Sequence, residues 1–147
     1  MFSHNTYCGL IILIELAGVY QQQGCLLEDI SHKHGIPTEA LTQALQRLTS
    51  IGLIEIRGNG SEWLFLHEDP KTIYIYDIIK LFDNSFSGHF HDSINGFFTK
   101  DSQLKLFLRE EQQTYERIIK NRIGRLSIET YVQRLKQKEK TIKLKLL

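Results

Sequence analysis

The sequence has few cysteines, and they are not arranged as in a metal or redox site. Cys8 and Cys25 are the two cysteines of the 147-residue chain, and no CxxC spacing occurs. Both lie in apolar stretches, and neither has an adjacent Lys or Arg that would stabilise a thiolate. A chain of this length can bury a core that is stable without disulfides or metal. We therefore expect two reduced, structural thiols in a cytoplasmic protein.

The sequence also lacks a hydrophobic run long enough to cross a bilayer. Residues 10–17 are apolar apart from Glu15, but this run is too short to span a membrane. Residues 1–9 contain no Lys or Arg, which a secretory signal carries ahead of its apolar part. We therefore expect neither a signal peptide nor a membrane partner.

No catalytic arrangement of side chains is visible, so we expect that the protein is not an enzyme and has no cofactor. His89, His91 and Asp92 form the one cluster with metal-ligating side chains. A zinc site needs three or four ligands at suitable geometry, and His67 is the only other histidine nearby. Histidines in such a segment are usually polar surface, so we expect no metal site.

The small net charge of +1 conceals two parts of opposite sign. Residues 1–100 carry 6 Lys and Arg against 11 Asp and Glu, a net charge of −5. Residues 101–147 carry 12 against 6, a net charge of +6. Strong nucleic-acid binders usually present excess positive charge, so the acidic first part argues against strong binding. Within that part, residues 33–60 are mildly basic.

Residues 27–66 nevertheless show the order of elements of a winged helix-turn-helix. Leu27–His34 is predicted to be a short helix that Gly35 ends. Pro37 fits the first turn of a second helix, which continues to about Ser50. The second helix of such a pair is the one that enters the major groove of DNA.

A hairpin is predicted directly after these helices. Residues 53–57 and 61–66 are its strands, because Gly58-Asn59-Gly60 tolerates the positive φ that a tight hairpin requires. Further helices are predicted over residues 5–20 and 75–82 from their apolar periodicity. The expected fold is therefore mainly α with a small β-hairpin, a winged helix-turn-helix body.

The outward side chains of the second helix are the first candidate site. Gln pairs with adenine edges, Glu accepts from cytosine, and Arg reaches guanine or phosphate. An Arg at a hairpin tip can enter the minor groove. The structural alternatives are an ordinary solvated helix face and a simple hairpin closure. The predicted DNA-contacting residues are Thr38, Glu39, Thr42, Gln43, Gln46, Arg47, Arg57 and Asn59.

The remainder of the chain is predicted to contain a connecting loop and a long helix. Residues 83–100 have no clean period, and residues 101–124 form the longest helix, capped by Asp101 or Ser102. A last short helix follows to Leu135, and the basic tail 136–147 is either an edge strand or disordered. The expected domains are 1–82, the loop 83–100, and 101–147. Residues predicted to pair two chains are Leu104, Leu108, Tyr115 and Ile118.

The chain resembles the winged-helix regulators typified by IscR and NsrR, the Rrf-two family. The resemblance begins at Met1-Phe2-Ser3 and Tyr7, and continues through His34-Gly35-Ile36-Pro37, Gly52-Leu53-Ile54 and residues 73–82. It covers about the first 82 residues in order and spacing. The resemblance implies a homodimer on double-stranded DNA, paired through the helix over residues 101–124.

The chain departs from this family in one chemically decisive respect. Cluster-bearing members hold three cysteines in the loop before the dimerisation helix, whereas residues 81–103 contain none. Because cluster irons need thiolates, we expect no iron–sulfur cluster. The wing is also short, and Asn5 and Thr6 stand where basic residues usually precede Tyr7.

The function expected is that of a sequence-specific, homodimeric transcriptional regulator. One alternative is a winged-helix adaptor that binds other proteins, which the acidic first part would suit. Another is a small-molecule sensor with a pocket beside the aromatic-rich residues 82–98. The operator, the effector and the sign of regulation are open.

Overall fold

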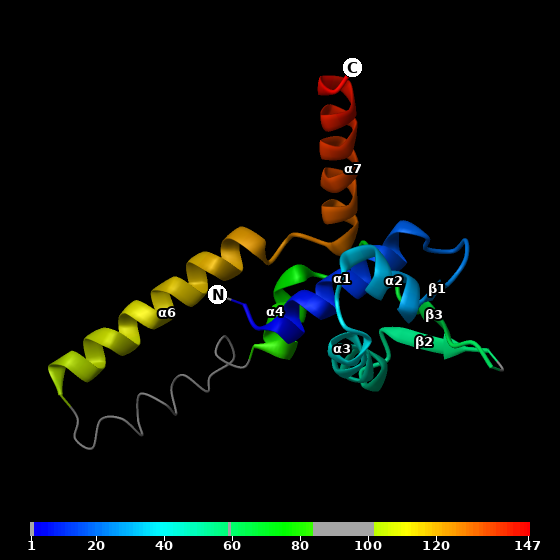
Figure 1. Cartoon of the computed structure of the whole chain (residues 1–147). Helices are drawn as coiled ribbons and strands as arrows, with labels where there is room; N and C mark the ends of the chain where they lie inside the picture. Colours follow the sequence, from blue (N-terminus) through cyan, green and yellow to red (C-terminus); the bar gives the residue numbers. More distant parts are fainter. Residues whose placement is uncertain (1, 59, 84–101) are drawn as a thin grey trace.

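A computed structural model describes residues 2–58, 60–83 and 102–147 of the chain. Its described part contains six helices and a three-stranded antiparallel sheet, which confirms the mainly helical winged-helix class (Figure 1). The elements in chain order are α1 (His4–Gly18), β1 (Cys25–Leu26), α2 (Leu27–His34), α3 (Thr38–Ser50), β2 (Ile54–Arg57), β3 (Trp63–Leu66), α4 (Ile75–Phe82), α6 (Gln103–Ile123) and α7 (Ile128–Lys145).

Helix α1 is the centre of the core. Ser3 begins it, because its hydroxyl accepts a hydrogen bond from the backbone N–H of Thr6 at 3.2 Å. Ile12 and Leu13 are fully buried, and Leu16 is nearly so. The helix packs against α3, α4, α7 and β3. An apolar stripe wider than one face allows this, since a helix surrounded by partners must be apolar on most sides.

The sheet contains a strand that the sequence pattern does not predict. Its order is β1-β3-β2, with β3 antiparallel to both neighbours. Strand β1 is two residues long, and its Cys25 and Leu26 pair with Leu64 and Trp63. The predicted hairpin is confirmed, with Ile54 opposite Leu66 and Arg57 opposite Trp63.

Helix α4 lies close to the start of α1. A Cβ placed on Gly9 would collide with the Phe82 ring, so glycine at this position allows the close approach. Just beyond α4, Asp83 Oδ2 accepts hydrogen bonds from the Thr6 hydroxyl at 2.7 Å and the Ser3 backbone N–H at 3.0 Å. Partial burial alone would raise the pKa of Asp83, but these hydrogen bonds outweigh it and lower the pKa.

The chain returns to the core beside the segment that precedes α4. Tyr74 and Ser127 form an antiparallel bridge. The Ile75 N–H donates to the Leu126 carbonyl, and the Ile128 N–H donates to the Ile73 carbonyl, both at 2.8 Å. Helix α7 thereby begins against α1, and its Ile128 and Val132 join the buried core.

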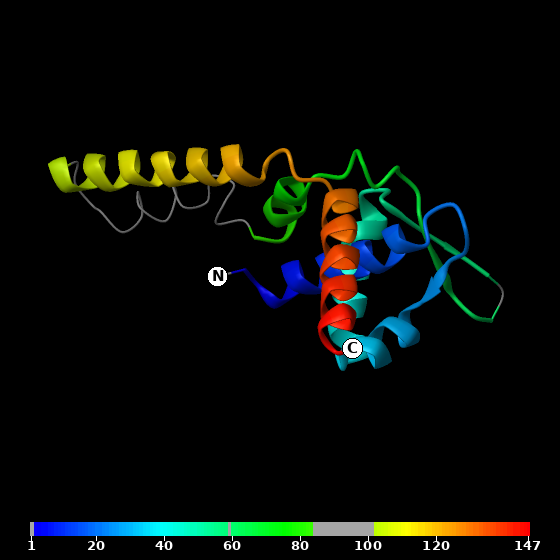
Figure 2. The ribbon, with the colours of Figure 1, turned by 90° about the horizontal axis from the view of Figure 1, so that it is seen from above.

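Two long helices extend away from this core. Helix α6 reaches outward in both views, and α7 rises from α1 on the side away from α3 (Figures 1 and 2). Ser102, one of the two predicted caps of α6, and Ser127 at the start of α7 accept hydrogen bonds from the Lys105 and Thr130 backbone N–H groups. None of the described helices is apolar over enough of its length to cross a membrane.

The prediction for residues 136–147 is wrong. They form neither a strand nor an irregular tail, because α7 continues without a break to Lys145. The alternation of Lys and Leu over residues 143–146 suggests a period of two. The helical spacing of Val132, Leu135 and Ile142 extends further along the chain and prevails.

Several predictions fall on positions outside the described residues. These are the connecting loop from residue 84 onward, the Asp101 cap, Asn59 at the wing, and the cluster His89, His91 and Asp92. The aromatic-rich segment 82–98, expected beside a pocket, lies outside them except for Phe82 and Asp83.

Replacing Asp83 with Ala should lower the free energy of unfolding by about 1–2 kcal/mol at neutral pH, because the buried Thr6 hydroxyl loses a charged acceptor. The folded pKa of Asp83 lies below the unfolded one. Its contribution is therefore fully present above the ordinary Asp pKa and disappears as the pH falls through the folded value. Denaturant titrations of wild type and variant at neutral and acid pH measure this difference.

The matched control is Asp77→Ala, which removes an exposed carboxylate whose partner is Lys80 on the same helix. It should cost less than about 0.5 kcal/mol, as exposed helical pairs do. Equal losses in the two variants would show that the Asp83 hydrogen bonds do not stabilise the fold.

Candidate nucleic-acid interface

The turn between α2 and α3 is fixed by local hydrogen bonds. Gly35 ends α2 with a φ of 64°, a conformation that glycine adopts without strain. The Ser31 hydroxyl donates to the Ile36 carbonyl at 2.6 Å. The sequence pattern predicts Pro37 in the first turn of α3. In the structure Pro37 is instead the N-cap of α3, one position earlier, with ψ at 136°. The turn is thereby held by the left-handed backbone of Gly35 and by the Ser31 side chain.

Helix α3 buries one side and exposes the other, as predicted. Leu41, Ala44 and Leu48 are fully buried against α1 and the core. The exposed side chains form what we call the reading face: Glu39, Gln43, Gln46 and Arg47. Within the described part of the chain, these four side chains form no hydrogen bond or ion pair. Their donors and acceptors are available to base edges and phosphates.

Thr38 and Thr42 belong to the same predicted set but differ from the reading face. Both are half-buried. The Thr42 hydroxyl donates to the Thr38 carbonyl at 2.8 Å, and the Thr38 hydroxyl donates to the Ser31 hydroxyl oxygen at 3.3 Å. Their hydroxyl groups support the turn and the first turn of α3. We therefore expect Thr38 and Thr42 to affect DNA binding indirectly, by holding α3 in position, and not by contacting DNA themselves.

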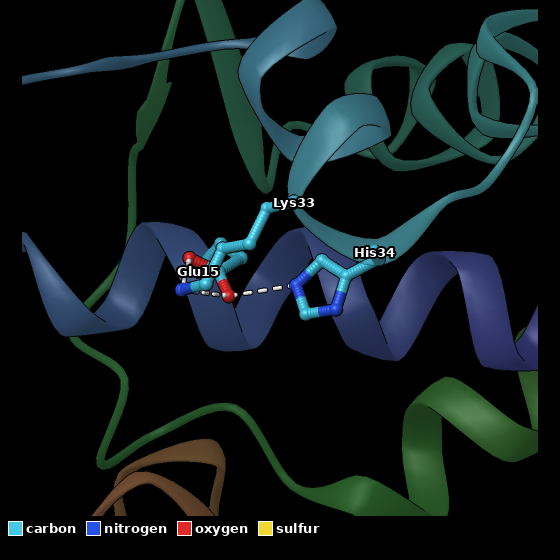
Figure 3. A network of polar contacts seen from close by, with 3 residues as sticks. All are labelled: Glu15, Lys33 and His34. Carbon is cyan, nitrogen blue, oxygen red and sulfur yellow. Dashed lines mark hydrogen bonds and ion pairs between the residues drawn. The ribbon is translucent and has the colours of Figure 1, made fainter.

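Helix α2 is held to α1 by one carboxylate (Figure 3). Glu15 Oε1 lies 2.8 Å from both Lys33 Nζ and His34 Nε2, at the end of α2. Burial alone would raise the pKa of Glu15, but the hydrogen bonds from Lys33 and His34 outweigh this and lower it. The ion pair is therefore strongest above the ordinary Glu pKa and is lost as the pH falls through the lowered value. It fastens α2, and hence the turn, to the core helix.

The wing places Arg57 at its base. Arg57 is the last residue of β2, and the predicted tip residue Asn59 lies outside the described residues. The Arg57 guanidinium pairs with Glu55 at 2.7 Å and stacks over the Phe65 ring at 4.5 Å. The hydrogen bond from Arg57 lowers the pKa of Glu55. Arg57 therefore already has an anionic partner, which a phosphate would have to displace.

The two thiols are unsuited to nucleophilic chemistry. Cys8 is buried in α1 and Cys25 is half-buried in β1, and both are free. Burial raises the pKa of each, and the charges of Glu15 and Asp29 raise that of Cys25 further. Across residues 2–58, 60–83 and 102–147, no three His, Cys, Asp or Glu side chains gather as a metal site requires.

The sequence of this chain matches a known family over nearly its whole length. The profile of the Rrf2 family, described as iron-dependent transcriptional regulators, aligns with residues 2–134. The chain belongs to the Rrf2 family. The members of this family are described as transcriptional regulators, and the resemblance predicted from the sequence is confirmed.

Solved structures share the fold at low sequence identity. CymR, the global cysteine regulator of B. subtilis, superimposes with a TM-score of 0.72 at 20% identity, over 90% of this chain and 96% of its own. IscR of T. potens superimposes with a TM-score of 0.67 at 16% identity, over 92% of this chain and 88% of its own. Identities this low establish the common fold alone.

One curated relative is closer in sequence over a shorter stretch. BadM of Rhodopseudomonas palustris, assigned as an HTH-type transcriptional regulator, is 35% identical over 82 residues. The match covers 55% of this chain and 51% of BadM, so the chain spans about half the length of this relative.

The Arg57–Glu55 pair predicts that removing Glu55 strengthens DNA binding. Glu55→Gln should raise affinity by about two- to fivefold at low salt, because an exposed ion pair is weak and Arg57 would become available to phosphate. The gain should largely vanish in an Arg57→Ala background. Fluorescence anisotropy on one duplex, arranged as a double-mutant cycle, measures the coupling.

Glu62→Gln is the control, since it removes an equal charge from the same wing at an exposed residue with no hydrogen-bond or ion-pair partner in the described chain. If Glu62→Gln gives the same gain, or if the Glu55 gain persists without Arg57, the effect is general electrostatics and the pair has no role in binding.

Proposed function

We propose that this chain is a sequence-specific DNA-binding transcriptional regulator that acts in the cytoplasm as a homodimer without an iron–sulfur cluster. The observation that carries the proposal is the reading face, where Glu39, Gln43, Gln46 and Arg47 are exposed and without partners in the described chain. Base recognition requires such unpaired donors and acceptors on a helix that can enter the major groove. The wing beside α3 supplies a second contact surface.

The electrostatics favour recognition that depends on base contacts. Residues 1–100 carry a net charge of −5, so few phosphate contacts are available to them. The acidic residues lie mainly outside residues 33–60. DNA phosphates would therefore repel the protein in orientations that bring these acidic surfaces to the DNA, and would not repel it when α3 faces the DNA. Affinity should then be modest and should fall only slowly with salt.

The homodimer proposal rests on the exposed face of α6. Leu104, Leu108, Tyr115 and Ile118 are all exposed, and Tyr115 retains 60% of its accessible surface. Among the described elements, α4 is the main one that α6 contacts. A contiguous apolar face of this kind marks an interface in a protein that remains in solution.

The spacing of this face fits pairing with itself. A twofold axis perpendicular to α6, at the level of residue 113 and on the side that carries Leu108 and Ile118, would make two copies of the helix antiparallel. Leu108 then lies opposite the partner copy's Ile118, and Glu111 lies opposite its Tyr115, so that a phenol can donate to a carboxylate. Such an interface is isologous, with the same patch contributed by both copies.

The proposal that no cluster is bound rests on the sequence. Residues 81–103 contain no cysteine, and the whole chain contains Cys8 and Cys25 alone. Iron–sulfur clusters in proteins are held chiefly by three or four thiolates. Cys8 is buried in the core helix, which leaves Cys25 as the single half-buried thiol. The family description refers to iron, but this chain does not offer the thiolates for a cluster of that kind.

Gln43→Ala tests base recognition. It should weaken binding to a site selected from random DNA by about 1–3 kcal/mol, as loss of a bidentate base contact does, and leave binding to unrelated duplex unchanged. Gel shifts with wild type and variant measure both affinities. Gln133→Ala, an exposed glutamine on α7, is the matched control. If wild type binds no duplex at low salt, the chain is an adaptor, a use that its acidic first part would suit.

Leu108→Glu combined with Ile118→Glu tests the dimer. The double variant should be a monomer at concentrations where wild type is a dimer, because four carboxylates would meet across the axis and could not be buried. Light scattering after size-exclusion chromatography gives the mass. Arg117→Glu with Lys120→Glu changes exposed residues of the same helix and should leave the dimer intact. A wild type that is monomeric at micromolar concentration would refute the proposal.

A further inference from the structure

The outer half of α7 continues an apolar stripe that α1 covers only at its beginning. Ile128 and Val132 are buried against the core. Leu135, Ile142 and Leu146 follow on the same side at alternating spacings of three and four residues, with Glu139 completing the pattern. These three apolar residues retain 47%, 57% and 82% of their accessible surface. The stripe has the heptad spacing of a coiled-coil seam, with one polar position.

Lysines occupy every position that flanks the exposed part of this stripe. Where Leu135 and Ile142 take the d position of the heptad, the e and g positions are Lys136, Lys138, Lys143 and Lys145. Side chains at the e and g positions determine the partner specificity of a coiled coil, because they contact the flanking residues of the facing helix. Four lysines select a helix with Asp or Glu on its flanks.

The same lysines disfavour pairing of α7 with the exposed helices α6 and α7 of a second copy. Two copies of α7 would place lysine against lysine, which is repulsive. On α6, the positions that flank its exposed seam include Gln112, Thr114 and Asn121, and none of its flanking residues is acidic. The partner of α7 therefore differs in chemistry from both exposed helices of this chain.

Glu139 distinguishes a protein partner from a membrane or nucleic acid. It occupies an a position, in the centre of the stripe between Leu135 and Ile142. Insertion into a bilayer would place this carboxylate among acyl chains, which is costly. Binding to DNA would place it beside phosphates and would not use the apolar residues. A facing helix can satisfy it with one Lys or Arg, in the way that a single polar a residue sets coiled-coil register.

We propose that the outer half of α7, residues 133–146, binds an amphipathic helix of another protein. That helix has an apolar stripe flanked by Asp or Glu and carries one Lys or Arg opposite Glu139. Figure 1 shows α7 rising from α1 away from α3, so the partner would bind on the far side of the core from the reading face. The regulator would thus hold DNA and a second protein at the same time, and this binding does not depend on the proposed DNA function.

A synthetic helix tests the chemistry directly. A peptide of about three heptads, with Leu at a and d, Glu at e and g, and one central Lys at a, should bind the full 147-residue chain saturably. Fluorescence anisotropy of the labelled peptide at low salt gives the affinity. A peptide of the same length with Lys at e and g should not bind. The same peptide with Leu in place of the central Lys should bind more weakly than the parent.

Variants of the chain locate the site. Lys138→Glu with Lys143→Glu should weaken binding of the acidic peptide by about tenfold and create binding to the Lys-flanked peptide. Arg134→Glu with Lys140→Glu is the matched control, since it changes net charge equally at exposed positions of the same helix that lie outside the flanks. Glu139→Leu should abolish the preference for the peptide with the central Lys.

Three results would overturn the proposal. One is the absence of saturable binding of the acidic peptide at concentrations up to about 1 mM, which corresponds to negligible affinity. Another is an equal loss in the two charge-reversal pairs, which would show nonspecific attraction. The third is that the acidic peptide does not bind, whereas duplex DNA or phosphatidylglycerol vesicles bind wild type and do not bind the Lys138→Glu, Lys143→Glu variant.

Discussion

The packing around α1 is the constraint on which the whole molecule depends. This helix is apolar on most sides because α3, α4, α7 and β3 all contact it. It therefore positions the reading face on one side and the outer half of α7 on the other (Figure 1). The carboxylate of Glu15 and the hydroxyl of Thr6 are its main polar attachments, one to α2 and one to Asp83. Burial supplies most of the stabilisation, and these polar contacts fix orientation.

The polar residues of this protein divide by whether their hydrogen-bonding groups are used within the chain. Thr38, Thr42 and Ser31 use theirs to hold the turn and the start of α3, and Gln43 keeps its amide available. Arg57 is intermediate, because Glu55 and Phe65 hold it in a defined place without burying it. Such a pair lowers the entropy lost on binding phosphate but adds the cost of displacing Glu55. Stability and recognition thus compete for the same side chain.

Periodic features could be predicted from the sequence, and contacts across elements could not. The bounds of α2 and α4 and the exposure of Gln43 follow from apolar spacing and from Gly35. Strand β1 has two residues and no period, so only its pairing with β3 reveals it. The cluster of Arg57 with Phe65 depends on strand register, which no local pattern specifies. At α7, a short alternation of Lys and Leu conflicted with a longer helical spacing, and the longer signal prevailed.

The bridge between Tyr74 and Ser127 has an evolutionary consequence. It closes the chain on itself, so that everything from α4 to the start of α7 forms a single insertion with both ends pinned to the core. The cost of closing such an insertion rises only slowly with its length. Lineages can therefore lengthen, shorten or recompose the part of this insertion that follows α4 without disturbing the helices that pack against α1. Because α6 belongs to that part, the spacing of the two reading faces in the proposed homodimer can evolve separately from the side chains that each reading face presents.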